Sequence, residues 1–126
     1  MSPEITEFAK LLIAHVRDMA ISELDISLRP SANDPRTRRW RQDIKGEKMN
    51  KIQFEMIPDC VDCTLFHFLN AIDQGLLKIS FTSKTGAVID LTKHGESEMA
   101  GEFMGADGWR LEYSEERVNN DFEDLV

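Results

Sequence analysis

The sequence lacks the features of a membrane or disulfide-rich secreted protein. It has only two cysteines in 126 residues, and its 41% hydrophobic content allows a core that needs no disulfide scaffold. No apolar run approaches the ~20 residues of a membrane span, because Lys10, His15, Arg17 and Asp18 interrupt the longest one. The N-terminal Met-Ser-Pro-Glu is acidic where an export signal would be basic. We therefore expect a cytoplasmic protein with no membrane contact.

Catalytic and cofactor-binding motifs are missing as well. The chain has no Walker loop, no glycine-rich dinucleotide turn and no G-x-S-x-G sequence. Its many carboxylates are explained by a solvated acidic face, without catalysis. We therefore predict a non-enzymatic protein that uses no cofactor, has no catalytic residues and holds no metal. No internal repeat or low-complexity tract divides the chain, so residues 1–126 are expected to form a single domain.

The first half of that domain predicts one long helix followed by a long loop. Apolar residues recur every three or four positions through residues 1–24, and Ser2 with Pro3 is typical of a helix start. Turn-forming residues and two prolines fill residues 29–48. A loop of this length inside a compact domain is usually functional or disordered.

The middle of the chain predicts a strand and a second helix. Apolar and polar side chains alternate over residues 52–56, and Pro58 ends that pattern. Asp59 or Asp62 is then suited to cap a helix that closes at Gly75. Because this helix is apolar on more than one face, we expect it to be central.

The last third predicts a hairpin, a short helix and a further strand. Residues 77–82 alternate, a Ser-Lys-Thr-Gly turn follows, and residues 87–91 return as the second strand. A short helix is expected over residues 96–104, an amphipathic strand over residues 109–113, and an acidic, mobile tail over residues 115–126. The predicted fold is a small α+β domain with a mainly antiparallel sheet, about three helices and one long basic loop.

The charges of the chain are unevenly distributed. The formal net charge is −8, yet residues 29–51 hold eight basic residues against three acidic ones. The rest of the chain holds seven basic and 20 acidic residues. A basic, proline-containing segment inside an acidic domain indicates recognition of a charged partner, or self-association between opposite patches.

The densest basic segment is the first candidate binding surface. Its candidate binding residues are Arg36, Arg38, Arg39, Trp40 and Arg41. Guanidinium groups bind phosphate or carboxylate, and a tryptophan among them can stack on a base or anchor a protein interface. Nucleic-acid contact is therefore one alternative function, although the acidic remainder of the surface repels phosphate. A disordered loop, an intramolecular clasp against the acidic C-terminal half and a subunit contact are three further interpretations.

Two cysteines and a histidine form a second alternative site. Cys60 and Cys63 make a CxxC pair at the start of the second predicted helix, where a helix N-terminus would favour the thiolates. His67 lies four residues after Cys63, on the same helical face, so a redox pair or a zinc site is conceivable. The flanking aspartates oppose a thiolate, and a structural zinc site needs a fourth ligand that only His15 or His94 could supply as an imidazole. Free cysteines are among the most buried residue types, so two thiols packed on a helix explain the pattern without any function, and we favour that interpretation.

The acidic C-terminal half supplies the leading hypothesis. Its candidate binding residues are six glutamates and two aromatic anchors: Glu96, Glu98, Glu102, Glu112, Glu115, Glu116, Trp109 and Tyr113. We predict a protein-interaction domain whose glutamates steer a basic partner while an aromatic residue anchors it. In size, acidity and lack of catalytic motifs, the chain is of the same type as small bacterial accessory proteins, such as the immunity proteins that inhibit basic toxins.

Overall fold

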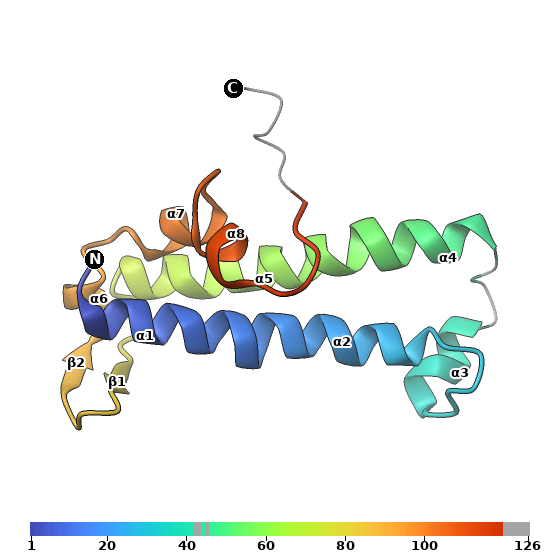
Figure 1. The fold of residues 1–126 in the computed structure, drawn as a ribbon, viewed down its shortest axis with the longest axis horizontal. Coiled ribbons are helices and arrows are strands. Elements are labelled where there is room, and N and C mark those ends of the chain that lie inside the picture. Colours follow the sequence, from blue (N-terminus) through green and yellow to red (C-terminus); the bar gives the residue numbers. More distant parts are fainter. Residues whose placement is uncertain (42–43, 45, 120–126) are drawn as a thin grey trace.

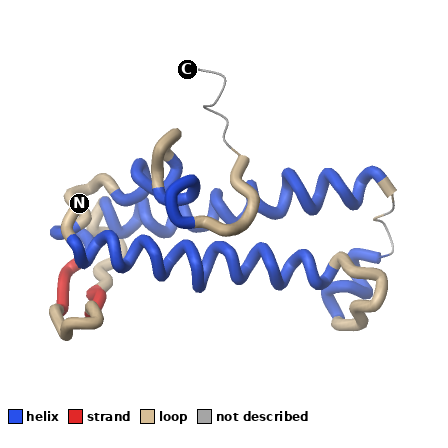
Figure 2. The backbone as a smooth tube through the Cα atoms, viewed as in Figure 1, coloured by secondary structure: helices blue, strands red, loops and turns tan. Residues whose placement is uncertain are grey.

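Two long helical segments lie antiparallel and side by side and make the body of the molecule (Figures 1 and 2). The computed structural model describes residues 1–41, 44 and 46–119. The first segment consists of α1 (Pro3–Leu12), the π-helical turn η1 (Ile13–Arg17) and α2 (Asp18–Ser27). The second consists of α4 (Glu47–Lys51), the π-helical turn η2 (Ile52–Met56) and α5 (Ile57–Asp73).

Smaller elements lie at the two ends of this helical pair. The helix α3 (Pro35–Arg41) lies at the end where the two segments are connected, and a hairpin of β1 (Ser80–Thr82) and β2 (Val88–Asp90) lies at the other end (Figure 1). The two strands are antiparallel, with Phe81 opposite Ile89. The short helices α6 (Leu91–His94), α7 (Met99–Met104) and α8 (Trp109–Tyr113) then bring the chain back over the helical pair.

The molecule is mainly helical, so the predicted α+β fold with a mainly antiparallel sheet is wrong. Helices hold 63% of the chain and strands 5%. The segment predicted as a strand over residues 52–56 is η2, and the one predicted over residues 109–113 is α8. A five-residue alternation of apolar and polar side chains spans little more than one helical turn, so it does not distinguish a strand from a helix.

The predicted long basic loop contains helical structure. Within residues 29–48, α3 occupies Pro35–Arg41 and α4 begins at Glu47, while residues 42, 43 and 45 lie outside the described part of the chain. The residues that were interpreted as turn formers, Asp34 and Pro35, are equally favoured as the cap and first residue of a helix. The residues that predict a turn here are therefore the ones that start α3.

Several local predictions are confirmed. Ser2 Oγ accepts a hydrogen bond from the Ile5 amide at 3.2 Å, and Pro3 is the first residue of α1. The second long helix ends just before Gly75, whose positive φ of 75° suits a residue that closes a helix. The hairpin forms with shorter strands than predicted, and the helix expected over residues 96–104 is present as α7, closed by Gly105.

One large apolar core lies towards the hairpin end of the helical pair. It is formed by buried side chains from α1, α5, α7 and their neighbours, including Ile13, Leu69, Met99 and Phe103. A second, smaller cluster of Ile21, Leu28 and Ile57 lies towards the end that holds α3. The molecule therefore has a heavily packed end and a lightly packed end, and the candidate surface described below lies at the second.

Pro58 is accommodated inside the second helical segment by the π-helical turn that precedes it. The Ile57 amide donates to the carbonyl of Ile52, five residues back. In that register the donor to the Gln53 carbonyl would be residue 58, and proline has no N–H. The guanidinium of Arg117 donates to this carbonyl at 2.7 Å instead. A proline that was expected to end a strand therefore lies within a continuous helical segment.

A buried ion-pair network joins the two segments to the C-terminal part. Arg17, fully buried in η1, donates to both carboxylate oxygens of Asp62, at 2.7 and 3.2 Å. Arg110 in α8 donates to the same carboxylate at 2.7 Å. Arg17 also contacts Asp18 at 3.2 Å and the Arg117 carbonyl at 2.7 Å. Asp62, expected as a possible helix cap, therefore holds three segments together.

The residues after α8 lie along the helical pair. Arg117 forms a two-pronged ion pair with Asp25, at 2.7 and 2.8 Å, and this contact raises the pKa of Arg117. The Asn119 side chain donates to Asp59 at 2.9 Å. The prediction of a mobile tail over residues 115–126 thus includes a stretch, residues 115–119, that is bonded to the body, while residues 120–126 lie outside the described part.

None of the described helices has an apolar stretch long enough to cross a bilayer.

Candidate functional site

The helix α3 is held in place by Asp34, which precedes it, and by Thr37 in its first turn, which contacts the end of α2. Asp34 Oδ1 accepts a hydrogen bond from the Thr37 amide at 2.9 Å, which caps the helix. The Thr37 hydroxyl donates to the Ser27 carbonyl at 2.8 Å, and Thr37 is buried. The side chain and the amide of Thr37 together lower the pKa of Asp34. The basic residues of α3 therefore project from a helix in a defined position.

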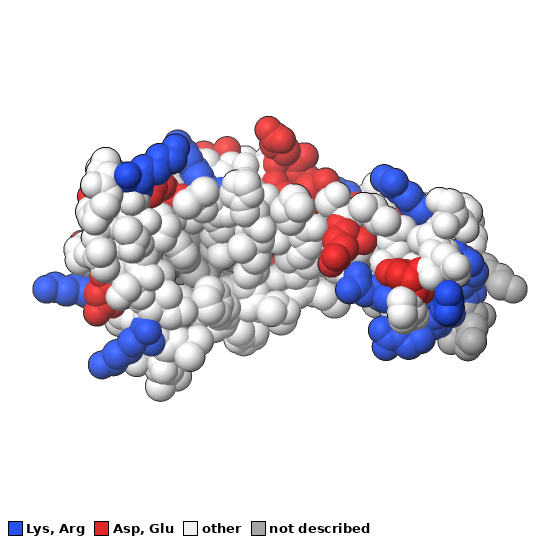
Figure 3. Space-filling view, turned by 90° about the horizontal axis from the view of Figure 1, so that it is seen from below, with Lys and Arg blue, Asp and Glu red and all other residues white. Residues whose placement is uncertain are grey.

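Basic side chains gather at this end of the molecule, as Figure 3 shows. We call this region the basic end and define it by its seven described cationic residues: Arg29, Arg36, Arg38, Arg39, Arg41, Lys48 and Lys51. Among the described side chains of residues 29–51, the one carboxylate is Asp34, and it caps α3. The basic end therefore carries a net positive charge on a molecule whose overall charge is −8.

Most of these cations keep their charge available to a ligand. Arg36 lies 3.8 Å from Glu23, and Lys51 lies 3.7 Å from Glu55, both in exposed pairs that contribute little. Arg38 donates to the Asn33 side chain at 3.2 Å. Among the side chains that the structure describes, no carboxylate lies within ion-pair distance of Arg29 or Arg39. The charge of the basic end is therefore only partly neutralised.

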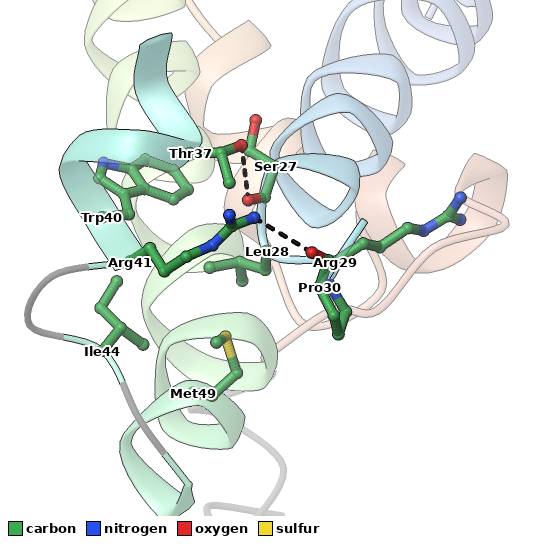
Figure 4. A pocket seen from close by; sticks show the side chains of 9 residues that line it. All are labelled: Ser27, Leu28, Arg29, Pro30, Thr37, Trp40, Arg41, Ile44 and Met49. Carbon is green, nitrogen blue, oxygen red and sulfur yellow. Dashed lines mark hydrogen bonds between the residues drawn. The ribbon is translucent and has the colours of Figure 1, made fainter. Parts of the chain in front are cut away.

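The basic end also contains a pocket of about 350 Å³, which we call the Trp40 pocket (Figure 4). It is lined by residues from α2, α3, α4 and the segments between them: Ser27, Leu28, Arg29, Pro30, Thr37, Trp40, Arg41, Ile44 and Met49. Figure 4 shows Trp40, Leu28, Ile44 and Met49 around the space. The walls are thus mainly apolar, and the cations lie at the edge.

Trp40 is half-buried between the pocket and the body of the molecule. Its side chain packs against the small cluster of Ile21, Leu28 and Ile57. The Arg36 guanidinium lies 5.9 Å from the centroid of its ring, within the range of a cation–π contact. One side of the Trp40 ring is therefore packed against the small cluster. The ring forms part of the wall of the pocket and does not project freely into solvent.

The predicted acidic surface is only partly assembled. Its glutamates are placed as follows: Glu96 and Glu98 precede α7, Glu102 lies in α7, Glu112 lies in α8, and Glu115 and Glu116 follow α8. Burial, followed by the charge of Glu112 and then that of Glu102, raises the pKa of the half-buried Tyr113, so these two glutamates lie near its phenol. Glu116 is paired with Arg117 at 3.3 Å. Two of the six predicted glutamates therefore lie close enough to Tyr113 to raise its pKa.

Trp109 cannot serve as the surface anchor that was predicted. It is 4% exposed, and its ring lies 6.4 Å from that of Phe8 in an edge-to-face contact. The alternation over residues 109–113 placed Trp109 on one face of a strand, whereas the helix α8 turns it into the core. Tyr113 is the aromatic residue of this surface that remains partly accessible.

The cysteine and histidine residues lie in the interior of a helical segment rather than at its start. Cys60 and Cys63 are free, exposed thiols of α5, and η2 with α4 continues the segment before them. Because the preceding turns engage the backbone amides, this CxxC pair lacks the free helix N-terminus that would favour a thiolate. His67 is exposed and packs edge-to-face on Phe66 at 5.4 Å. In the described part of the chain, no three metal-ligating side chains form a cluster.

The pocket is the part of the site that the sequence did not predict. The arginines and Trp40 were predicted, and the structure brings them together at the basic end. Leu28, Ile44 and Met49 come from three separate segments, and no local pattern indicated that they would line one cavity.

Comparisons with protein-family models, curated proteins and solved structures found no match for this chain. The interpretation of the site therefore depends on its own geometry and chemistry.

Proposed function

We propose that this protein is a non-enzymatic protein-interaction domain whose basic end binds an acidic segment of a partner protein. One observation carries the proposal: the cations of α3 and α4 are gathered around an apolar pocket at one end of the molecule (Figures 3 and 4). Guanidinium groups around an apolar cavity combine charge recognition with the burial of an anchor, which is the usual composition of a protein-binding hot spot.

The partners that the α3 arginines have within the chain support this proposal. Their contacts come from residues 23–33: Arg36 with Glu23, Arg38 with Asn33, and Arg41 with the carbonyls of Pro30 and Ala32. An intramolecular clasp would require carboxylates of the C-terminal half beside these arginines, and none of the described ones lies there. The described contacts therefore support the binding of an external ligand at the basic end.

An acidic protein segment fits this surface better than a nucleic acid does. The overall charge of −8 repels the extended phosphate backbone wherever it leaves the basic end. Trp40, which would have to stack on a base, is half-buried and has Arg36 over its ring. We further propose that the protein acts in the cytoplasm, where its two free thiols would stay reduced.

The acidic surface around Tyr113 remains a second candidate, for a basic partner. The position of Glu102 and Glu112 near the Tyr113 phenol is the observation that favours it. Without Trp109, however, this surface has a single partly accessible aromatic residue, over whose ring Lys10 already lies at 5.7 Å. A second copy of this chain could present such a surface to the basic end, so self-association is one of the outcomes to be measured.

Binding of a labelled acidic peptide tests the proposal. A fluorescein-labelled dodecapeptide rich in Asp and Glu would be titrated by fluorescence anisotropy at low and at moderate salt. The triple variant Arg38→Gln, Arg39→Gln, Lys48→Gln should weaken binding about tenfold at low salt, from three exposed charge contacts of ~0.2–1 kcal/mol each. Salt should reduce the difference because it screens exposed charges.

A matched triple variant at the other end is the control. Lys78→Gln, Lys84→Gln, Lys93→Gln removes the same charge from exposed lysines outside the basic end, and it should leave peptide affinity nearly unchanged. Equal effects of the two triple variants would contradict the proposal. Tighter binding of single-stranded or duplex oligonucleotides than of the peptide, at equal salt, would instead favour nucleic-acid contact. Concentration-dependent self-association that blocks the peptide would favour a second copy.

A further inference from the structure

We infer that the Trp40 pocket receives one large apolar side chain of the acidic partner segment, with carboxylates next to it bound by the arginines at the rim. This inference rests on the proposed function and specifies the chemistry that the site recognises. The pocket volume of about 350 Å³ lies at the small end of the ~300–1,000 Å³ that small-molecule sites occupy. A leucine, methionine or phenylalanine side chain is smaller than this volume and therefore fits in the pocket without a clash.

The two hydroxyl groups in the wall of the pocket, those of Ser27 and Thr37, are already hydrogen-bonded. The Thr37 hydroxyl donates to the Ser27 carbonyl at 2.8 Å, as Figure 4 shows. The Ser27 hydroxyl lies 3.3 Å from Asp34 and 3.4 Å from Arg36. A nucleobase in this space could not hydrogen-bond to these two hydroxyls without breaking the bonds that they already make, which is costly in an apolar environment. An apolar side chain makes no hydrogen bonds with water, so it loses none when it enters the pocket.

The cations at the rim select for carboxylates near that side chain. Arg41 reaches across the pocket, and its Nη2 donates to the carbonyl of Pro30, as Figure 4 shows. The same nitrogen also donates to the carbonyl of Ala32. Among the side chains and backbone groups that the structure describes, Nη1 and Nε of Arg41 have no hydrogen-bond partner, so they can donate to a ligand. Arg29 lies on the other side of Pro30 and extends away from the cavity. A carboxylate next to the apolar residue would meet Arg41, while a carboxylate further along the segment, beyond Pro30 and outside the cavity, would meet Arg29.

The spread of the basic end indicates a peptide rather than a small amphipathic acid. Arg38 and Arg39 lie on α3 and Lys48 lies on α4, and these three are exposed and outside the lining of the pocket. A molecule confined to the cavity could not contact them. A segment of polypeptide with one apolar residue and several carboxylates can fill the cavity and neutralise the cations beyond it.

Three acidic nonapeptides that differ in one residue test the inference. The central residue is leucine, phenylalanine or serine, with aspartate and glutamate on both sides. Burial of the apolar side chain should make the leucine and phenylalanine peptides bind about tenfold tighter than the serine peptide. Binding would be followed through the two tryptophan indole signals in ¹H–¹⁵N spectra of ¹⁵N-labelled protein. The Trp40 signal should shift, while that of Trp109, which is buried in the core, serves as the internal reference.

A pocket-filling substitution locates the effect. Met49→Trp adds volume to a residue that lines the pocket without changing charge. It should remove the advantage of the leucine and phenylalanine peptides and leave the affinity of the serine peptide nearly unchanged. Met19→Trp makes the same change at a methionine of α2 that is 60% exposed and outside the pocket, so it should retain the advantage. If Met49→Trp does not fold, the affinities of the three peptides for the native protein still test the inference.

The outcomes separate this inference from the proposed function. Equal affinity of all three peptides, with the loss in the Arg38, Arg39 and Lys48 triple variant preserved, would overturn the inference and keep the function. Failure of every acidic peptide to bind would overturn both. Octanoate, added alone as a probe, would overturn the peptide assignment if it moved the Trp40 signal more strongly than the leucine peptide at equal concentration.

Discussion

At the residue scale, Asp62 is the group on which the association of three segments depends. Its carboxylate is 2% exposed and accepts hydrogen bonds from Arg17 in η1 and Arg110 in α8. Two guanidinium groups around one carboxylate leave an excess positive charge, which Asp18 offsets through its contact with Arg17 at 3.2 Å. Such a network contributes little net stability while it is complete, but removal of one member leaves buried charge without a partner.

Asp62→Asn should therefore destabilise the protein strongly. Breaking a buried ion pair on one side costs about 3–5 kcal/mol, because the remaining charges stay buried and uncompensated. The measurement is urea-induced unfolding followed by circular dichroism. Asp107→Asn, at an exposed position between α7 and α8, is the matched control and should stay within about 0.5 kcal/mol of the native protein. Similar unfolding free energies for the two variants would refute the assigned role of Asp62.

Asp34 provides a pH-dependent prediction at the same scale. The side chain and the amide of Thr37 lower the pKa of Asp34, so its carboxylate stabilises the folded state above the pKa of an unfolded aspartate, about 3.9. That contribution is lost as the pH falls through the lowered, folded-state pKa. An NMR titration of the Asp34 carboxyl carbon should give a value below the unfolded one, and Thr37→Val should raise it. An unchanged pKa in Thr37→Val would contradict the assignment.

At the element scale, the two π-helical turns show how the helices accept their unusual residues. The turn η1 contains Arg17, whose side chain reaches Asp62 on the other segment. The turn η2 precedes Pro58, and Arg117 takes the place of the proline's missing amide at the Gln53 carbonyl. Both turns thus lie where the helical segments meet the C-terminal residues, and both depend on side chains that are distant in sequence.

The junction of α7 and α8 gives a prediction with its control in the neighbouring helix. A Cβ on Gly108 would lie 1.9 Å from the Glu102 carbonyl oxygen, so Gly108→Ala forces the backbone to move. We expect a destabilisation of about 1–3 kcal/mol, seen as a lower midpoint of thermal unfolding. At Gly101, within α7, a Cβ meets no atom within 4 Å, so Gly101→Ala should stabilise by up to about 1 kcal/mol. A tolerated Gly108→Ala would show that this junction is not closely packed.

The elements differ in how far the sequence could predict them. Ser2, Pro3 and Gly75 act through their own backbone and its neighbours, so the ends of the long helices were predictable from local pattern. The helical state of residues 52–56 was not, because five alternating residues span little more than one helical turn, and the Arg117 contact at the Gln53 carbonyl comes from far away in sequence. In the candidate site, the arginines were predictable as a run of charge. The pocket was not, because its walls are assembled from three helices.

At the scale of the whole molecule, the two ends differ in their charge and in the size of the apolar core beneath them. The large core and the ion-pair network lie away from α3, and the basic end is built on the smaller cluster of Ile21, Leu28 and Ile57. Figure 3 shows a broad uncharged surface over the middle of the molecule, with the cations of the basic end beside it. A positively charged end on an acidic molecule orients an acidic partner as it approaches and excludes a basic one.

The most direct measurement of the central claim is a footprint of an acidic peptide on the whole protein. The leucine nonapeptide would be titrated into ¹⁵N-labelled protein, and the shift of each backbone amide would be recorded. The account predicts shifts at the basic end, among residues 27–51, that disappear in the Arg38, Arg39 and Lys48 triple variant. Shifts centred on Glu102, Glu112 and Tyr113, or the same shifts in the triple variant, would contradict it.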